Sequence, residues 1–197
     1  MKLSSNAAAV ASPMRCIESP ARGPSGARGF TLVELLASLS VLAILTTLTA
    51  ASMSSTLNNN FIYATQTEFV ASLALARSEA ARRGLPVVVS ATTPAAGNAF
   101  GGGWTVWVDT NGNGVFDAHS DPVLRSHEAL PGTIQIGNGA TTAFGFSSMG
   151  FLTQGATVDI KVCPKDGSVA GFDITVQPNG IVDVADVAAN TTPCNGA

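Results

Sequence analysis

Hydrophobic and polar positions divide the chain into three parts. Residues 1–29 are mixed in polarity, residues 30–53 are predominantly apolar, and the remainder consists of short apolar runs separated by polar residues. The central run is long enough to cross a bilayer as an α-helix. Its one charged side chain is Glu34, and the next charged residue is Glu68. The pattern predicts a transmembrane helix over residues 30–53 with a single carboxylate near its start.

Helical periodicity continues beyond the apolar run. Intervals of three and four residues separate Phe61, Thr65, Phe69, Leu73, Ala76 and Ala80. This spacing puts them on one helix face, so the stripe is expected to pack on a core. Asparagines at 58–60 are weak helix formers and are expected to loosen the helix locally. Basic residues at 82–83, then Gly84 and Pro86, are typical of a helix end. The sequence predicts a helical spine over residues 30–83, and the segment 54–84 is expected to dock on the rest of the chain.

Residues 85–197 have the pattern of a β-rich domain, because short apolar runs alternate with Gly, Asn and Pro. Eight strands are expected, at residues 87–91, 104–109, 123–127, 133–136, 142–147, 157–162, 172–176 and 181–184. Their close spacing indicates antiparallel pairing. The predicted fold class is α+β, a long N-terminal α-helical spine packed on a C-terminal antiparallel β-sheet domain. Trp104 and Trp107 are expected to be core or strand-face aromatics.

The junction before the apolar run carries a specific motif. Residues 28–34 read Arg-Gly-Phe-Thr-Leu-Val-Glu, which resembles the class III signal of type IV prepilins and type II secretion pseudopilins. An ordinary secretory signal is cleaved after its apolar region, whereas this glycine precedes it. The resemblance implies that a prepilin peptidase removes the leader, residues 1–29, after Gly29, and that Phe30 is N-methylated. It also implies that Glu34 pairs with the N-terminal amine of a neighbouring subunit, because a charge at low dielectric needs a close partner.

Charges around the apolar run set the expected topology. Arg22 and Arg28 precede it, which places the leader in the cytoplasm by the positive-inside rule. The protein is therefore expected in the inner membrane as a single-pass protein, with residues 54–197 in the periplasm. The expected partners are the prepilin peptidase, inner-membrane lipid and the other pilins or pseudopilins of a filament.

A second motif spans the end of the predicted helix. Residues 75–87, Leu-Ala-Arg-Ser-Glu-Ala-Ala-Arg-Arg-Gly-Leu-Pro-Val, are similar to an element of the GspH/FimT family of minor pseudopilins and minor pilins. The resemblance implies a pilin-like fold and a structural role in the tip or initiation complex of a type II secretion pseudopilus. The alternative is a FimT-like type IV pilus minor pilin that assists pilus assembly or DNA uptake. Arg77 and Glu79 are expected on a solvated face, and pairing with neighbouring side chains is the less favoured alternative.

The charge balance argues against nucleic acid as a partner. The leader holds four of the ten basic residues and one of the thirteen acidic residues, which leaves six and twelve and a formal net charge of −6. Nucleic-acid binding depends on neutralising phosphates. Where DNA-binding FimT proteins carry a basic Gly-Arg-x-Arg element, residues 178–183 contain no arginine and include Asp183. Nucleic acid is therefore not an expected partner.

The polar segment after residue 108 has the spacing of a cation-binding loop. Oxygen-bearing side chains at positions one, three, five and nine, with glycine at six, match the first half of an EF-hand loop: Asp109, Asn111, Asn113 and Asp117. The twelfth position should be glutamate but is Ser120, followed by Asp121. Repeated Asn-Gly pairs are typical of a β-hairpin loop. We expect a hairpin loop with no cofactor or metal, and calcium binding is the less favoured alternative.

The remaining reactive side chains indicate a structural protein. Cys16 would be lost with the leader, which leaves Cys163 and Cys194. An even pair in an exported domain predicts a disulfide. His119 and His127 occur without a nucleophile, P-loop or zinc motif, so no enzymatic activity is expected.

Overall fold

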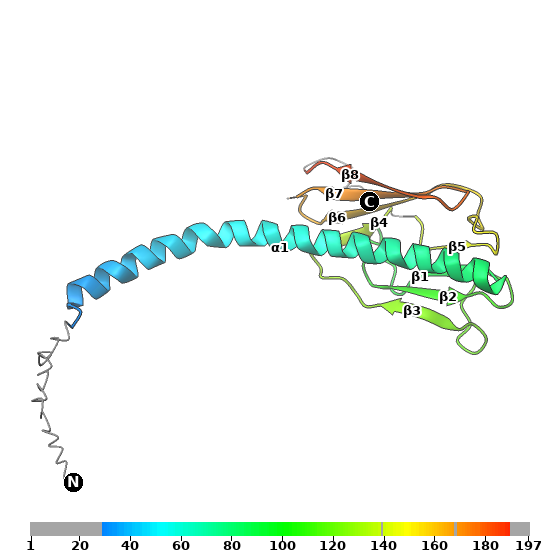
Figure 1. Cartoon of the computed structure of the whole chain (residues 1–197), viewed down its shortest axis with the longest axis horizontal. Coiled ribbons are helices and arrows are strands. Elements are labelled where there is room, and N and C mark those ends of the chain that lie inside the picture. Colours follow the sequence, from blue (N-terminus) through cyan, green and yellow to red (C-terminus); the bar gives the residue numbers. More distant parts are fainter. Residues whose placement is uncertain (1–28, 139, 168, 190–197) are drawn as a thin grey trace, which may run out of the picture. The chain divides into compact units, whose positions relative to one another are not determined.

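A computed structural model describes residues 29–138, 140–167 and 169–189, excluding the side chains of residues 47–52, 54 and 55. Most of the leader (residues 1–28) and Cys194 lie outside the described residues. Contacts divide the chain into two compact units, Met1–Ala43 and Ile44–Ala197. In the second unit, the later part of the helix runs along two β-sheets (Figure 1).

One α-helix, α1 (Leu32–Arg83, 52 residues), accounts for almost all of the predicted spine. Thr31 caps its start, because the Thr31 carbonyl and hydroxyl oxygens accept from the Glu34 amide at 3.1 and 3.3 Å. Gly84 ends the helix in a left-handed conformation with φ of 68°, which glycine adopts at little cost. The asparagines at 58–60 were expected to loosen the helix but are helical.

The helix in the first unit presents its apolar side chains outward. Seven side chains there are between 53% and 79% exposed: Leu32, Val33, Leu35, Leu36, Leu39, Val41 and Leu42. Within the described part of the chain, no helix is both long enough and apolar enough to span a membrane. The predicted membrane segment, residues 30–53, includes side chains that are not described and stays a prediction.

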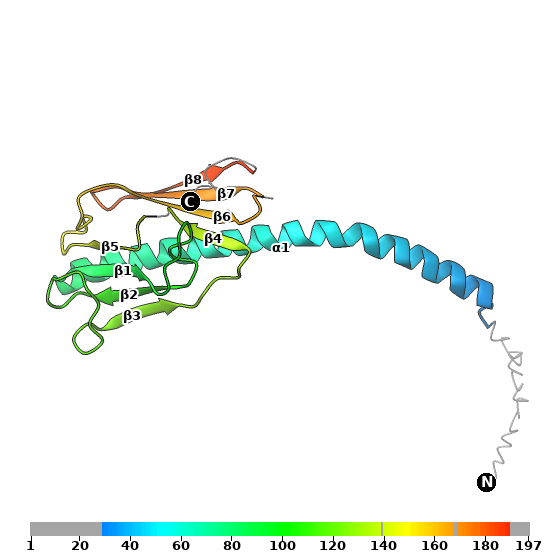
Figure 2. The same ribbon diagram turned by 180° about the vertical axis from the view of Figure 1, so that it is seen from behind.

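Eight strands form two four-stranded antiparallel sheets, which lie in front of the helix in the view of Figure 2. Sheet A has the order β3-β2-β1-β5, from β1 (Val87–Ala91), β2 (Trp104–Val108), β3 (Val123–His127) and β5 (Ala143–Phe146). Sheet B has the order β4-β6-β7-β8, from β4 (Ile134–Gly137), β6 (Val158–Pro164), β7 (Gly171–Val176) and β8 (Val182–Val187). All eight predicted strands are present, and the α+β fold class is confirmed.

The core lies between α1 and the inner faces of the sheets. Its helix side chains are Ile62, Phe69, Leu73, Ala76 and Ala80, all fully buried. The predicted stripe was wrong at its first position, since Phe61 is 46% exposed and Ile62 is buried in its place. Phe61 lies four residues before the buried Thr65, and Ile62 lies three residues before it. Both intervals put a side chain on the same helix face as Thr65, so spacing alone does not distinguish the two residues.

The two tryptophans are buried on opposite faces of sheet A, as core and strand-face aromatics. Trp104 faces the helix, where its ring meets Phe69 edge-on at 5.2 Å and its Nε1 donates to Ser72 Oγ at 3.0 Å. Trp107 faces the other way, and its Nε1 donates to Ser90 Oγ at 3.0 Å. The expectation for both residues is confirmed, and each buried indole N–H has a partner.

Candidate functional site

The N-terminal segment combines an accessible glycine with a lone carboxylate. Gly29 and Phe30 precede the helix, and Phe30 is 80% exposed. A Cβ added to Gly29 would meet no atom within 4 Å, and its φ lies outside the left-handed region. Among the described residues, the fold therefore does not require glycine at this position.

Glu34 lies one turn into the helix among exposed apolar side chains. Its backbone amide is capped by Thr31, but its carboxylate has no hydrogen-bond or ion-pair partner among the described residues. A carboxylate that is taken out of water, into a bilayer or between packed apolar helices, is costly unless an opposite charge pairs with it. The arrangement suits a partner cation that another molecule supplies.

The loop after β2 is organised around the buried carboxylate of Asp109. Its Oδ1 accepts from the amides of Gly112 and Asn113 at 2.8 and 3.1 Å, and its Oδ2 accepts from Gly114 at 2.7 Å. Asp109 is 3% exposed. A carboxylate that accepts several backbone N–H groups fixes a turn strongly, because these are charge-assisted bonds.

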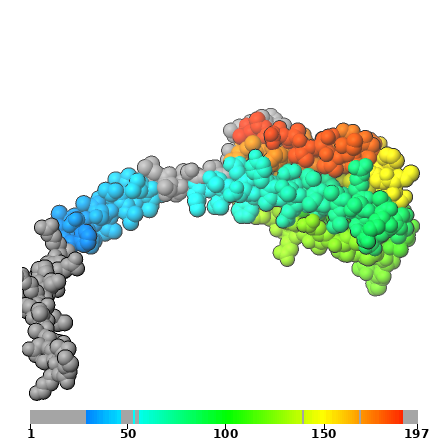
Figure 3. Space-filling view, in the orientation of Figure 1, coloured from blue at the N-terminus to red at the C-terminus, as the bar shows by residue number. Residues whose placement is uncertain are grey.

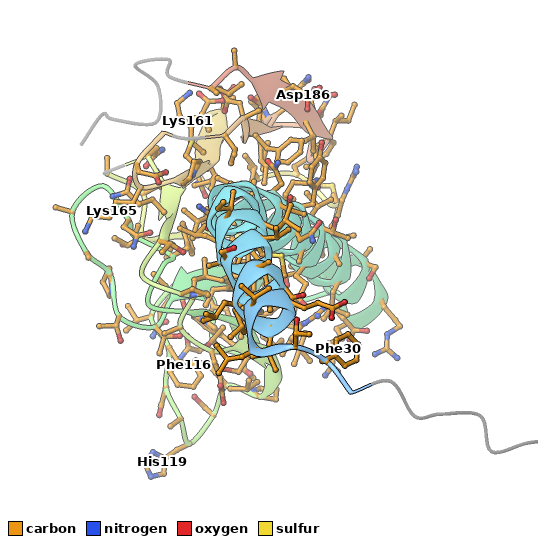
Figure 4. The ribbon with its side chains drawn as sticks, turned by 90° about the vertical axis from the view of Figure 1, so that its left-hand side faces the viewer. Phe30, Phe116, His119, Lys161, Lys165 and Asp186 are labelled. Atoms are coloured by element: carbon orange, nitrogen blue, oxygen red, sulfur yellow. The ribbon has the colours of Figure 1, made fainter. Side chains whose placement is uncertain are left out.

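A second carboxylate closes the other end of this loop. Asp121, 4% exposed, accepts from the amides of Thr110 and Asp117 at 3.0 and 2.9 Å. Asp117 accepts from the His119 amide and the Ser120 hydroxyl, which together hold the pKa of the Asp117 carboxyl below its usual range. The tip of the loop is exposed, with His119 projecting away from it (Figure 4).

These contacts bear directly on the four residues predicted for calcium. The carboxylate oxygens of Asp109 and Asp117 accept hydrogen bonds from backbone amides of the loop or from a hydroxyl group. The side-chain oxygens of Asn111 and Asn113 each accept from the backbone amide two residues further along the chain. In the described ranges, no three His, Cys, Asp or Glu side chains are grouped so that they could hold a metal ion. The contacts seen are those of a self-capped loop, and calcium binding stays an untested alternative.

The element at residues 75–87 carries internal contacts that sequence reasoning did not identify. Glu79 accepts from Arg82 Nη2 at 2.6 Å and from Arg83 Nε at 2.7 Å, and its side chain is only 14% exposed. Hydrogen bonds from Arg82 and then Arg83 lower the pKa of Glu79. Arg77 donates from Nη2 to the carbonyl of Asn179 at 3.2 Å. Arg77 is exposed, as expected of a solvated face, whereas Glu79 follows the less favoured alternative and pairs with its neighbours. These charges link the helix end to itself and to a distant turn.

His127 is a second position that the sequence did not identify as important. Its Nε2 lies 2.5 Å from Glu68 Oε2 on the helix, and its Nδ1 lies 2.7 Å from the Glu128 carbonyl. The side chain is 22% exposed. Glu68 and His127 are 59 positions apart in the sequence, so no local pattern could have revealed the pair. The contact joins α1 to the edge strand β3.

Cys163 is buried on β6 and is disulfide-bonded. Its predicted partner, Cys194, lies outside the described residues, so the pairing remains a prediction.

The fold is similar to that of FimU, a type IV minor pilin from Pseudomonas aeruginosa strain PAO1. One crystal form of FimU is 21% identical with a TM-score of 0.50, and the match covers 60% of this chain and 88% of FimU. A second form is 21% identical with a TM-score of 0.51, over 64% of this chain and 90% of FimU. At this identity the likeness establishes the fold alone. No curated protein matches the chain.

Two sequence families match the chain, each in a separate region. The prokaryotic N-terminal methylation motif matches residues 24–50, which include the glycine, phenylalanine and glutamate of the N-terminal segment. The family described as type II transport protein GspH matches residues 65–180, from the docked half of α1 to the turn before β8. With a prepilin-type N-terminus and a GspH match over more than half of its length, the chain belongs to the GspH family of minor pseudopilins and type IV minor pilins, which are structural subunits.

Proposed function

We propose that this protein is a minor pseudopilin of a type II secretion system, a structural subunit of the pseudopilus tip or initiation complex. The observation that carries the proposal is the match of residues 65–180 to the type II transport protein GspH family, on a chain that also has the N-terminal methylation motif at residues 24–50.

In this proposal the N-terminal segment directs processing and insertion. A prepilin peptidase cleaves after Gly29, and Phe30 becomes the N-methylated first residue. Residues 30–53 cross the inner membrane once, and residues 54–197 lie in the periplasm. The exposed apolar side chains on the first part of α1 support this arrangement, because a surface of that kind needs lipid or other helices against it. An oxidising periplasm also suits the disulfide at Cys163, for which we propose Cys194 as partner.

Assembly follows from the lone carboxylate. We propose that Glu34 pairs with the N-terminal amine of a neighbouring subunit when helices pack in the filament. Each charge compensates the desolvation of the other only if the two are close, so the pair fixes the axial register of the two helices. This step requires no catalytic residue or cofactor in this chain.

No metal is part of this proposal. The loop at residues 109–121 is a structural hairpin loop in which carboxylates cap amides. Its test is a thermal unfolding scan of the full chain with excess calcium and with chelator. We expect the same melting temperature in both; a rise that saturates with calcium, and that Asp117→Asn removes, would establish a calcium site instead.

Gene deletion in the native host tests the main proposal. Loss of the gene should leave secreted substrates inside the cell, and restoration of the full-length chain should restore secretion. The second candidate is a type IV pilus minor pilin, which the fold likeness to FimU favours. In that case the deletion would reduce surface pili or DNA uptake and leave protein secretion unchanged.

A further inference from the structure

A groove of about 550 Å³ runs along the second half of α1 in the larger unit. Its helix wall is apolar apart from Arg77 and Ser78, and its other wall comes from two turns and the first residue of β8. The lining includes Leu73, Ala74 and Arg77 on the helix and Met149, Gly150 and Gly180 in the two turns. Figure 3 shows this face, with the green helix below the red β8 and the yellow turn near residue 150 at one end.

The two turns in the wall opposite the helix are tight and packed on each other. Gly150 donates to the Ser147 carbonyl and Gly180 to the Gln177 carbonyl, each at 2.8 Å. The φ angles of Gly150 and Gly180 are 78° and 77°, in the left-handed region that favours glycine. A Cβ atom on Gly180 would collide with the Gly150 carbonyl oxygen. This backbone packing gives the groove a preformed shape, which lowers the entropic cost of binding.

Arg77 is the one charged residue of the lining. Its guanidinium lies over both turns and donates one hydrogen bond of 3.2 Å, to the neutral carbonyl of Asn179. No carboxylate of the described residues forms an ion pair with it, whereas Arg82 and Arg83 on the same helix end share Glu79. Arg77 therefore retains donors for a carboxylate, which arginine binds in a fixed bidentate geometry.

We propose that this groove binds a segment of another filament subunit that presents apolar side chains and one carboxylate, from aspartate, glutamate or a chain terminus. The apolar walls, with exposed Met149 at the rim, bury the side chains, and Arg77 pairs with the carboxylate. One cation is too few for a nucleic-acid backbone, whose binding rests on several neutralised phosphates. The inference rests on the proposed function, because it takes the partner to be a filament subunit.

Site-specific photo-crosslinking in the native host tests the proposal on the full chain. A photoreactive residue replaces Ala74, which lines the groove, and in a matched control it replaces Ala71, which is exposed on the same helix but does not line it. We expect an adduct at position 74 only, and mass spectrometry should map it to a different subunit, within a few residues of a carboxylate. Identification of the crosslinked peptide distinguishes a side-chain carboxylate from a terminal one.

Two kinds of variant test the chemistry of recognition. Arg77→Gln should reduce the yield of the adduct about tenfold and Arg77→Lys by less, because only the first removes the charge. Ala74→Trp fills the groove and should reduce incorporation of the chain into the filament, whereas Ala71→Trp should not. If Arg77→Gln lowers the melting temperature sharply, its adduct yield is not interpretable, and the comparison of Ala74→Trp with Ala71→Trp tests the proposal instead. Both alanines are exposed, so these two substitutions are expected to leave the fold intact.

Several results would overturn the inference. These are an absent adduct at position 74, an adduct to a second copy, lipid or nucleic acid, a partner segment without a carboxylate, or normal incorporation of Ala74→Trp. Each of them leaves the proposed function standing if the unmodified chain still co-purifies with filament subunits and supports secretion. Failure of the unmodified chain to do either would overturn the proposed function instead.

Discussion

The imidazole ring of His127 stacks on the indole ring of Trp104, with ring centroids 3.9 Å apart and planes 5° from parallel. The same indole donates to Ser72 Oγ on α1, and the imidazole reaches Glu68 one turn earlier on that helix. Trp104 is fully buried. Two side chains on neighbouring strands thus hold one stretch of the helix through polar contacts as well as apolar packing.

Ser72→Ala should destabilise the protein by about 1–3 kcal/mol, because it leaves the buried indole N–H of Trp104 without an acceptor. Urea unfolding of the full chain in detergent, followed by tryptophan fluorescence, measures the change. Ser78→Ala is the matched control, since its hydroxyl is exposed and bonds only to the Leu75 carbonyl within the helix. The control should stay within about 0.5 kcal/mol of the parent. Equal effects would show that the indole contact contributes little.

Asp109→Asn should destabilise the loop after β2, because one of the two oxygens that accept from three backbone amides becomes an amino group. We expect a loss of about 1–3 kcal/mol in the free energy of unfolding. Asp186→Asn makes the same chemical change on an exposed edge of β8 and should cost under about 0.5 kcal/mol. Hydrogen exchange should also become faster at the amides of residues 112–114, and unchanged exchange there would contradict the capping role.

Acid should weaken the helix end through Glu79. The two arginines hold the pKa of Glu79 below its ordinary value of 4.5, so the folded state binds a proton here less readily than the unfolded state. The contribution to stability is therefore full above pH 4.5 and is lost as the pH falls through the lower folded value. Unfolding curves of the parent and Glu79→Gln should differ at neutral pH and converge in acid. Parallel curves would exclude this linkage.

Cys194→Ser should remove the disulfide at Cys163 and destabilise the mature domain. The chain-entropy model gives about 3–4 kcal/mol for a closed loop of about thirty residues. Thiol labelling under denaturing conditions should detect no free cysteine in the mature parent and one in the variant. Cys16→Ser should change neither the labelling of the mature chain nor its melting temperature. A free thiol at position 194 in the parent would refute the predicted pairing.

Much of the fold could be predicted from local pattern. Gly84 and Pro86 mark the end of α1, and turn residues separate all eight strands, because these residue types act on the backbone where they stand. It was harder to predict which residue begins the buried face of the docked half of α1. Phe61 and Ile62 both have the spacing of that face, and only packing against the sheets decides between them. Division into two sheets also needs non-local information, because β5 pairs with β1 and β6 pairs with β4.

The candidate sites likewise differ in whether local sequence or the tertiary fold brings their residues together. Gly29, Phe30 and Glu34 lie within one short motif, so the sequence alone is enough to propose their roles, which stay predictions. The groove could not be predicted, because Arg77 meets the turn at Asn179 only through the tertiary fold. In the loop at residues 109–121, the spacing of the oxygen-bearing side chains is apparent from the sequence. The same spacing allows those oxygens to bind a cation or to accept hydrogen bonds from the loop's own amides. Only the structure shows Asp109 bonded to those amides.

Glu34→Ala should leave the chain in the membrane but impair its incorporation into the filament. Removal of one carboxylate makes residues 30–53 more apolar, so insertion does not suffer. The neighbouring subunit then keeps an uncompensated N-terminal amine in a low-dielectric setting, which disfavours assembly. Membrane fractionation measures insertion, and co-purification with the other subunits measures incorporation. Glu34→Asp should retain part of the function, because it keeps the charge on a shorter side chain.

Ser38→Ala is the matched control for this substitution. Ser38 lies one turn further along α1, is exposed, and bonds only to the Glu34 carbonyl within the helix. It should insert, assemble and support secretion as the parent does. Normal incorporation of Glu34→Ala would remove the charge pair from the assembly mechanism. Loss of both insertion and incorporation would show that Glu34 acts earlier, during export or processing at Gly29.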